Sequence, residues 1–131
     1  MSISAATPYL IVDGASDAID WYRDALDAEE VARAVGGAGR VAHAELRIGD
    51  SRVFVGEEHP HLEGIHAPPR IRGTPVYLDL ETDDVAGTFE RACAAGAEAI
   101  RPPTDPALPL QTAKFRDPFG HIWLISRSTG A

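Results

Sequence analysis

His43 and Glu45 are the two residues whose types and spacing come closest to reactive chemistry. They stand two positions apart in residues 40–48, where apolar and polar side chains alternate. This alternation predicts a β-strand with both side chains on one face. An imidazole and a carboxylate placed in this way are able to share a metal ion or to act as an acid–base pair. A polar pair on a solvated face of a sheet is the other interpretation, and it is the more common one.

Three more histidines, His59, His61 and His66, lie among glutamates between residues 57 and 73. Imidazoles with carboxylates suit Zn²⁺ or Ni²⁺, but spacing within a flexible loop defines no ligand geometry. We therefore interpret residues 57–73 as a solvated loop, and a role as a lid over a pocket stays open. Cys93 lies beside alanines in an expected helix, has no histidine close to it in the sequence, and is interpreted as core packing.

The composition of the 131-residue chain favours one domain, residues 1–131, in a reducing compartment, because there is a single cysteine. Twenty acidic residues against twelve basic ones give a net charge of −8, which opposes binding to a phosphate backbone. We therefore expect no nucleic-acid partner. No apolar run approaches the ~20 residues of a membrane span, so we expect no membrane association and a cytoplasmic location.

Hydrophobic periodicity predicts the order strand, helix, strand, strand, strand twice. The first repeat covers residues 6–56, the second covers residues 74–128, and the loop 57–73 connects them. In the first repeat, apolar residues recur at helical spacing after Ser16 and Asp17, and either of these two is expected to cap the helix.

A single repeat buries only the face of its sheet that the helix covers, so its other face and its edges stay exposed. Two repeats predict an α+β fold, in which a curved, mostly antiparallel sheet has both helices outside and a concave inner face. The exposed edges also favour association with a second copy of the chain. We therefore expect a homodimer.

The more apolar register of each strand is expected to face the helices, and this decides which residues line the inner face. In the strand expected over residues 74–81, Tyr77 and Asp79 point inward. Tyr9 and Leu124 hold inward positions in the first and last strands. An inward Asp79 needs an arginine, another hydrogen-bond donor or a ligand cation beside it, because a buried carboxylate without a partner is costly.

Aromatic side chains are the natural platforms for a planar ligand. The candidates are Tyr9, Phe54, Tyr77, Phe115 and Trp21. Core packing is the alternative for each of them, and it is favoured for Trp21. Tyr9 and Tyr77 stand apart because both hold inward positions in equivalent strands.

Four segments of the chain, residues 9–13, 18–22, 43–50 and 116–123, resemble the vicinal oxygen chelate superfamily. They read YLIVD, AIDWY, HAELRIGD and RDPFGHIW, and they occur in the order that the superfamily shows over nearly the whole chain. The third segment is most similar to the glyoxalase/bleomycin-resistance branch. The resemblance implies the fold of that branch, with two tandem βαβββ modules in one domain.

Members of the superfamily with metal chemistry place His or Glu at four inner-face positions. These positions fall here on Thr7, on Phe54 or Val55, on Tyr77 and on Leu124. None of these side chains supplies the imidazole or carboxylate that the usual metal ions require. The resemblance therefore implies a protein without a metal or another cofactor.

The function that the resemblance implies is binding, with a flat aromatic antibiotic or related metabolite sequestered in clefts at a homodimer interface. One alternative is a glyoxalase-like lyase or isomerase that uses His43 and Glu45. Another is an interaction module without a small ligand. The residues expected to line the cleft are Tyr9, His43, Glu45, Phe54, Tyr77, Asp79, Phe115 and Leu124.

Overall fold

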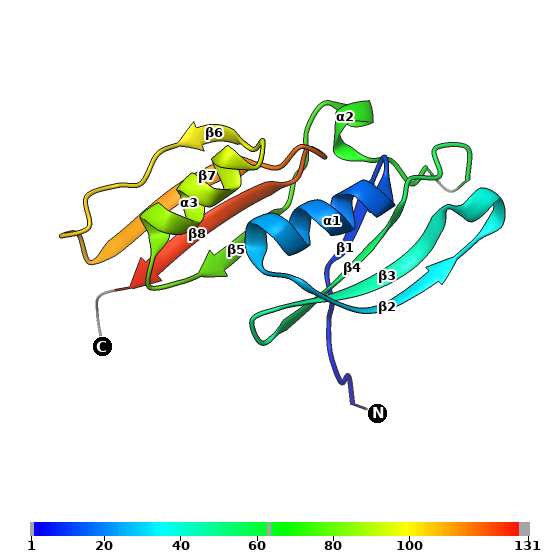
Figure 1. The fold of residues 1–131 in the computed structure, drawn as a ribbon, viewed down its shortest axis with the longest axis horizontal. Coiled ribbons are helices and arrows are strands. Elements are labelled where there is room, and N and C mark those ends of the chain that lie inside the picture. Colours follow the sequence, from blue (N-terminus) through cyan, green and yellow to red (C-terminus); the bar gives the residue numbers. More distant parts are fainter. Residues whose placement is uncertain (1, 63, 129–131) are drawn as a thin grey trace. The chain divides into compact units, whose positions relative to one another are not determined.

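A computed structural model describes residues 2–62 and 64–128 of the chain (Figure 1). The chain divides into two compact units, one ending at Ala67 and the other beginning at Pro68. Each unit contains a four-stranded mixed sheet, and the strands of the two sheets follow the same order in space. This arrangement confirms the expected α+β fold built from βαβββ modules.

The first unit places one helix over one face of its sheet (Figure 1). Its elements are β1 (Tyr9–Val12), α1 (Ala15–Leu26), β2 (Glu29–Val35), β3 (Val41–Ile48) and β4 (Ser51–Glu57), with a 3-10 turn at Gly37–Gly39. The strand order is β1-β4-β3-β2, with β1 parallel to β4 and the other neighbours antiparallel. Leu10 and Val12 are buried toward α1, as the alternation predicts.

The start of α1 is held by a residue from the far end of the same unit. The helix begins at Ala15, directly after Gly14, whose φ of 97° is comfortable only for glycine. Neither Ser16 nor Asp17 caps it, so that expectation was wrong. Instead, the Glu57 carboxylate accepts hydrogen bonds from the backbone N–H groups of Gly14 (3.1 Å) and Ala15 (2.5 Å). A distant carboxylate thus occupies the anion site that a helix N-terminus provides.

The second unit repeats the topology. Its elements are α2 (Pro68–Ile71), β5 (Tyr77–Glu81), α3 (Val85–Ala94), β6 (Glu98–Arg101), β7 (Leu110–Arg116) and β8 (Ile122–Ser128). The order is β5-β8-β7-β6, and β5 is parallel to β8. The strand expected from residue 74 begins only at Tyr77. Unlike α1, α3 is capped by its own neighbour, because Asp84 accepts a hydrogen bond from the Gly87 N–H at 3.0 Å.

Phe115 belongs to the core of the second unit. Its side chain is 0% exposed and stacks on Trp123, with ring centroids 6.4 Å apart and an angle of 12° between the planes. Alternation along β7 puts Phe115 and Ala113 on the face covered by α3. The expected position of Phe115 in the ligand cleft was therefore wrong: the aromatic ring fills the layer between sheet and helix.

Candidate functional site

The open face of the first sheet, which α1 does not cover, carries a cluster of three rings from three strands. Tyr9 comes from β1, His43 from β3 and Phe54 from β4. The Tyr9 hydroxyl lies 2.8 Å from His43 Nδ1. Ring centroids are 5.3 Å apart for Tyr9 and His43, 5.7 Å for Tyr9 and Phe54, and 4.8 Å for His43 and Phe54. We call these three residues the aromatic cluster. All three were expected to line one site, and the structure brings them into contact.

Gly56 makes room for the aromatic cluster. A Cβ atom added there would lie 3.0 Å from both Cε1 and the hydroxyl of Tyr9 and 3.1 Å from the Ala42 carbonyl oxygen. Such contacts are tighter than packed interiors accept, so a side chain at this position would displace the tyrosine ring or the backbone. The absence of a side chain at Gly56 therefore lets Tyr9 reach across β4 to His43.

The Tyr9–His43 contact gives the cluster a polar handle. Burial raises the pKa of Tyr9, so its hydroxyl keeps its proton at neutral pH. Either the hydroxyl donates to Nδ1 and leaves a Nε2 hydrogen for a ligand, or Nδ1–H donates to the phenol oxygen and leaves Nε2 as an acceptor. In both arrangements one ring nitrogen stays available, because Nε2 of His43 has no partner within the described residues.

Glu45 shares the open face with His43, as the two-residue spacing predicts, but the two do not form an acid–base pair. The Glu45 carboxylate accepts two hydrogen bonds from Arg52, at 3.1 Å from Nε and 2.9 Å from Nη2. The Arg52 guanidinium also lies 5.6 Å from the centre of the Phe54 ring. Glu45 therefore acts with Arg52 as a charged border beside the aromatic cluster.

The second sheet has an open face of its own, with Tyr77, Asp79 and Leu124 on it as expected. Asp79 accepts a hydrogen bond from the Ser126 hydroxyl at 2.8 Å and is not paired with an arginine among the described residues. Lys114, which the sequence analysis did not select, places its Nζ 4.6 Å from the centre of the Tyr77 ring. A signal for it existed: Lys114 lies between buried Ala113 and Phe115, so it must face the opposite way.

The positions where metal-dependent relatives would hold their ion do not fit a metal here. Phe54 packs against His43, Val55 is buried in the core, and Tyr77 lies under the Lys114 ammonium. These side chains, with Thr7 and Leu124, offer no imidazole or carboxylate donor.

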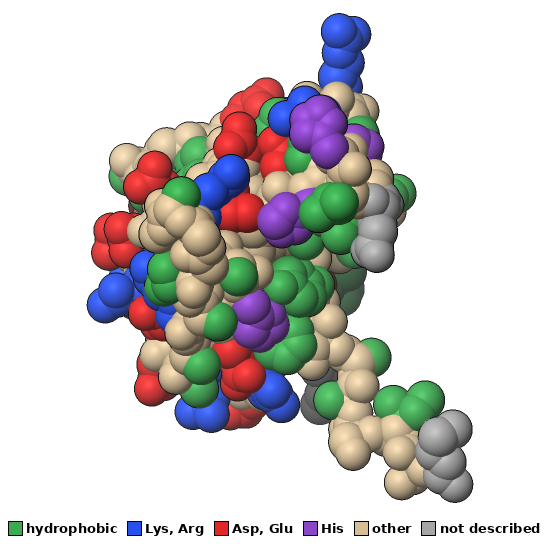
Figure 2. Space-filling view, turned by 90° about the vertical axis from the view of Figure 1, so that its right-hand side faces the viewer, with side chains coloured by type: hydrophobic (Ala, Val, Ile, Leu, Met, Phe, Trp, Pro, Cys, Tyr) green, Lys and Arg blue, Asp and Glu red, His purple; other side chains and the backbone are tan. Residues whose placement is uncertain are grey.

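The histidine-rich segment forms a closed turn at the end of the first unit. The His59 N–H donates to the Ile65 carbonyl at 2.8 Å, and the two residues form an antiparallel bridge. In the parts of the chain that the structure describes, no three His, Cys, Asp or Glu residues gather to hold a metal ion. Figure 2 shows histidine side chains lying among hydrophobic ones on one face of the molecule.

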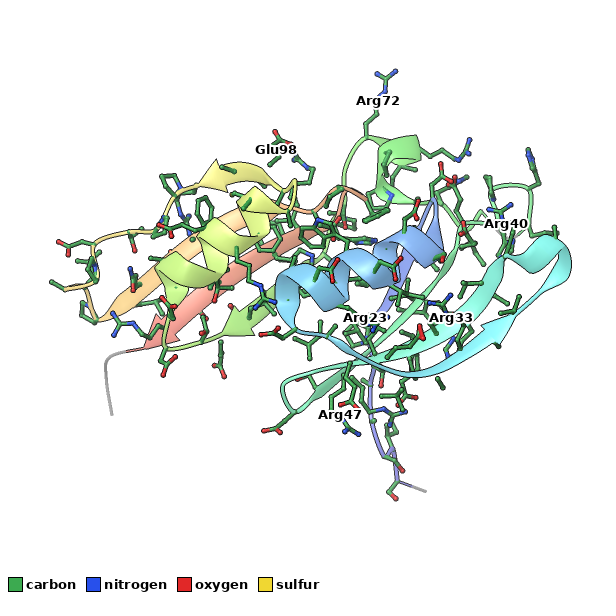
Figure 3. All side chains as sticks on the ribbon, viewed as in Figure 1. Arg23, Arg33, Arg40, Arg47, Arg72 and Glu98 are labelled. Atoms are coloured by element: carbon green, nitrogen blue, oxygen red, sulfur yellow. The ribbon has the colours of Figure 1, made fainter. Side chains whose placement is uncertain are left out.

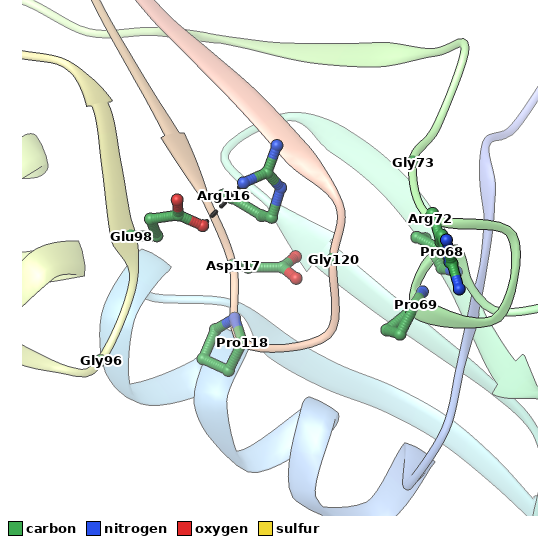
Figure 4. A pocket seen from close by; sticks show the side chains of 10 residues that line it. All are labelled: Pro68, Pro69, Arg72, Gly73, Gly96, Glu98, Arg116, Asp117, Pro118 and Gly120. Carbon is green, nitrogen blue, oxygen red and sulfur yellow. Dashed lines mark hydrogen bonds and ion pairs between the residues drawn. The ribbon is translucent and has the colours of Figure 1, made fainter.

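A groove of about 500 Å³ lies in the second unit, beside the turn between β7 and β8 (Figure 4). Three of the four charged side chains that line it are engaged. Arg116 pairs with Glu98 at 2.6 Å, and the Asp117 carboxylate accepts hydrogen bonds from Phe119 N–H, His121 N–H and Trp123 Nε1–H. The acid thus holds the turn. The lining residues are Pro68, Pro69, Arg72, Gly73, Gly96, Glu98, Arg116, Asp117, Pro118 and Gly120.

Glu57 is a buried acid that the sequence analysis did not select. Burial would raise its pKa, but the N–H groups of Ala15 and Gly14 and the Arg40 guanidinium outweigh this effect and lower the pKa. Arg40, which follows the glycine-rich turn between β2 and β3, lies 2.9 Å from the carboxylate (Figure 3). The charge on Glu57 is structural, because it joins three segments of the first unit.

The fold and the sequence place the chain in a known family. The chain belongs to the Glyoxalase/Bleomycin resistance protein/Dioxygenase superfamily, whose model matches residues 3–125. An uncharacterized protein of Mycobacterium bovis is 37% identical over 125 residues, which cover 94% of this chain and 82% of that protein. An uncharacterized protein of Mycobacterium tuberculosis H37Rv has the same identity over 94% of this chain and 74% of its own.

Solved structures of the same fold come from bacteria and a plant. TioX from Micromonospora sp. ML1 is 26% identical, with a TM-score of 0.71 over 98% of both chains. A gene product of Arabidopsis thaliana is 25% identical, with a TM-score of 0.75 over 95% of this chain and 99% of its own. The fosfomycin resistance protein FosX from Mesorhizobium loti is 18% identical, with a TM-score of 0.69 over 98% and 95% of the two chains, and supports the fold alone. No helix in the described residues is long and apolar enough to cross a membrane.

Proposed function

We propose that this protein binds a flat, partly aromatic small molecule without a catalytic metal and holds it non-covalently, as a sequestering protein does. The observation that carries the proposal is the aromatic cluster on the open face of the first sheet. Three rings in mutual contact form a platform for stacking, and Tyr9 is 46% exposed. Stacking on such rings adds about 0.5–1.5 kcal/mol per good pair beyond the burial of apolar area.

Two further features support binding in preference to catalysis. Glu45 is engaged by Arg52, so the carboxylate that an acid–base mechanism needs beside His43 has another partner. The four inner-face positions that metal-dependent relatives use for their ligands carry no imidazole or carboxylate in this chain. The family description includes a bleomycin resistance protein, so an antibiotic or related natural product is the class of ligand that we propose.

The lyase or isomerase alternative is supported by one observation, the 2.8 Å contact between the Tyr9 hydroxyl and His43 Nδ1. A phenol and an imidazole in hydrogen-bond contact are able to pass a proton to or from a bound substrate. In this alternative Tyr9 takes the role first expected of Glu45. A reaction with a Tyr9-dependent rate would favour it over sequestration.

We also propose that the protein acts as a homodimer in the cytoplasm, with ligand clefts formed between copies. The edge strand β2 supports association, because Val31 and Val35 on it are exposed and its outer backbone groups have no neighbouring strand among the described residues. Light scattering coupled to size-exclusion chromatography measures the mass directly. A monomeric mass at micromolar concentration would remove the dimer from the proposal.

The proposed function is tested by titrating the protein with bleomycin and with a set of planar aromatic acids and their amides, followed by calorimetry. We expect at least one planar compound to bind and Tyr9→Ala to weaken it by about tenfold, which corresponds to 1.4 kcal/mol. Leu108→Ala is the matched control, because Leu108 is similarly exposed but lies in the segment between β6 and β7, outside the aromatic cluster and outside β2. Binding that is unchanged in Tyr9→Ala, or no binding by any compound, would overturn the proposal.

The metal-free part of the proposal has its own measurement. Protein purified without chelators and without a polyhistidine tag is analysed for Zn, Ni, Mn and Fe. We expect less than stoichiometric metal before and after soaking in each ion. A stoichiometric metal that is lost on His43→Ala would contradict the proposal and favour the enzyme alternative.

A further inference from the structure

Lys114 is the one lysine in the 131-residue chain, and it lies on the open face of the second sheet. Its neighbours Ala113 and Phe115 are fully buried on the other face, toward α3. The remaining eleven basic residues are arginines. A lysine ammonium is a compact charge with three rotatable donors, whereas an arginine presents a planar fork. The one ammonium side chain of the protein therefore lies on the open face of the second sheet, beside Tyr77.

The Lys114 side chain reaches across a neighbouring strand. Lys114 pairs with Leu124 of β8, and Tyr77 of β5 pairs with Ile122 on the far side of the same strand. Nζ nevertheless lies 4.6 Å from the centre of the Tyr77 ring, so the apolar stem extends over β8. The cation–π contact fixes the ammonium above the sheet, while 54% of Tyr77 remains exposed.

The ammonium has no carboxylate partner within the described residues, although acids outnumber bases by twenty to twelve in the chain. The ion pairs described above, Arg40 with Glu57, Arg52 with Glu45 and Arg116 with Glu98, all use an arginine. Asp79 lies on the same face, two strands away from Lys114, yet its carboxylate accepts from the Ser126 hydroxyl. The N–H groups of the Lys114 ammonium are therefore available to a ligand.

We propose that the open face of the second sheet binds an anionic aromatic molecule, whose carboxylate, sulfate or phosphate oxygen accepts hydrogen bonds from the Lys114 ammonium. This site is separate from the aromatic cluster of the first sheet and goes beyond the proposed function. An ammonium provides charge-assisted hydrogen bonds to such an oxygen, which are about twice as strong as neutral ones. The net charge of −8 repels anions at long range, so the recognition has to be local. Tyr77 holds the ammonium in place and is a positioning residue in this scheme.

A single lysine makes a direct experiment possible. Reductive methylation with isotope-labelled formaldehyde marks only Lys114 and the α-amino group, and methylated lysine keeps its charge. The labelled protein is titrated with naphthoate and with naphthamide, which have the same ring system but differ in charge. We expect naphthoate to shift the Lys114 methyl signal and to bind about tenfold more tightly than naphthamide.

Three variants separate local recognition from overall charge. Lys114→Gln is expected to abolish the preference for naphthoate, and Lys114→Arg to retain most of it. Arg72→Gln removes the same charge from an exposed side chain that extends from the segment after α2 (Figure 3), and it is expected to leave the preference unchanged. A purely structural Lys114 would alter stability in Lys114→Gln without altering the ratio of the two affinities.

The outcomes also distinguish this inference from the proposed function. Equal binding of naphthoate and naphthamide, with an unmoved Lys114 signal, overturns the anionic ligand and leaves aromatic binding in place. A preference for naphthoate that survives in Lys114→Gln overturns the role of Lys114. If no acid and no amide of the planar set binds, the proposed function fails, and this inference fails with it.

Discussion

The two sheets share one strand order but differ in what they place on their open faces. The first combines the rings of Tyr9, His43 and Phe54 with the closed ion pair of Glu45 and Arg52. The second combines one exposed tyrosine with a lysine and an aspartate that do not pair with each other. This difference indicates that burial restricts the residue type only at the positions that face a helix. The outward positions of the same framework are free to become a stacking platform in one unit and a charged surface in the other.

The cores differ as well, and a truncation of the second core is the largest effect that we expect. Trp123→Ala removes a buried ring that stacks on Phe115 and donates Nε1–H to Asp117 at 2.8 Å. It is expected to lower the free energy of unfolding by about 3–5 kcal/mol, measured by urea denaturation. Trp21→Ala, at a partly exposed position in α1, serves as control and is expected to cost less. Equal losses in the two variants would contradict the assignment of Trp123 to the core.

The two helices differ in how their N-termini are held, and Glu57→Gln tests this difference. The pKa of Glu57 is lowered in the folded protein, so the carboxylate stabilises the fold above its unfolded pKa. This contribution disappears as the pH falls through the folded pKa. We expect Glu57→Gln to cost about 2 kcal/mol at neutral pH and much less in acid. Unfolding curves at both pH values measure it.

Asp84→Asn is the matched variant for α3. It changes a cap that is exposed and local, and asparagine caps a helix nearly as well as aspartate. We expect a loss of a few tenths of a kcal/mol at neutral pH. A loss as large as that of Glu57→Gln would show that the two caps are equivalent after all.

Gly56→Ala is expected to have a smaller effect on stability and a clear effect on binding. The new methyl group meets Tyr9 and the Ala42 carbonyl oxygen at 3.0–3.1 Å, so the aromatic cluster must shift. We expect a loss of about 1 kcal/mol in stability and weaker binding of planar compounds by calorimetry. Gly37→Ala is the matched control, because a Cβ atom added at Gly37 meets nothing within 4 Å. Unchanged affinity in Gly56→Ala would show that binding does not depend on the position of the Tyr9 ring.

Asp79→Asn gives the smallest expected effect and sharpens the charge comparison. The variant removes a negative charge from the face that carries Lys114 while it keeps an acceptor for the Ser126 hydroxyl. We expect naphthoate to bind about twofold more tightly and naphthamide to be unaffected, since exposed charges interact weakly. Weaker binding of naphthoate would instead indicate that Asp79 takes part in holding the ligand.

Local patterns in the sequence were sufficient for the fold. Alternation with the inward Tyr9 puts Leu10 and Val12 on the helix side, and both are buried. Alternation fails where residue type is given more weight than position. Phe115 was selected as an aromatic ring, although its place between Lys114 and Arg116 puts it in the core.

The site was less predictable, because its main contacts join residues far apart in the chain. Spacing placed Tyr9, His43 and Phe54 on one face. The contact between Tyr9 and His43, however, requires a glycine at position 56 of a third strand, because a side chain there would collide with the tyrosine ring. The bidentate pairing of Glu45 with Arg52 across the β3–β4 hairpin decides that His43 has a different partner. A single sequence contains these residues but does not indicate which pairs form.

The cap on α1 also has a consequence for the folding of the chain during its synthesis. Glu57 lies 42 positions after the helix start that it holds, whereas Asp84 directly precedes α3. During synthesis α1 leaves the ribosome well before its cap exists, and its first turn stays frayed until β4 has been added. The C-terminal half of the chain carries no such delay, because α3 emerges together with the residue that closes it. After its own synthesis, α1 therefore waits longer for its cap than α3 does.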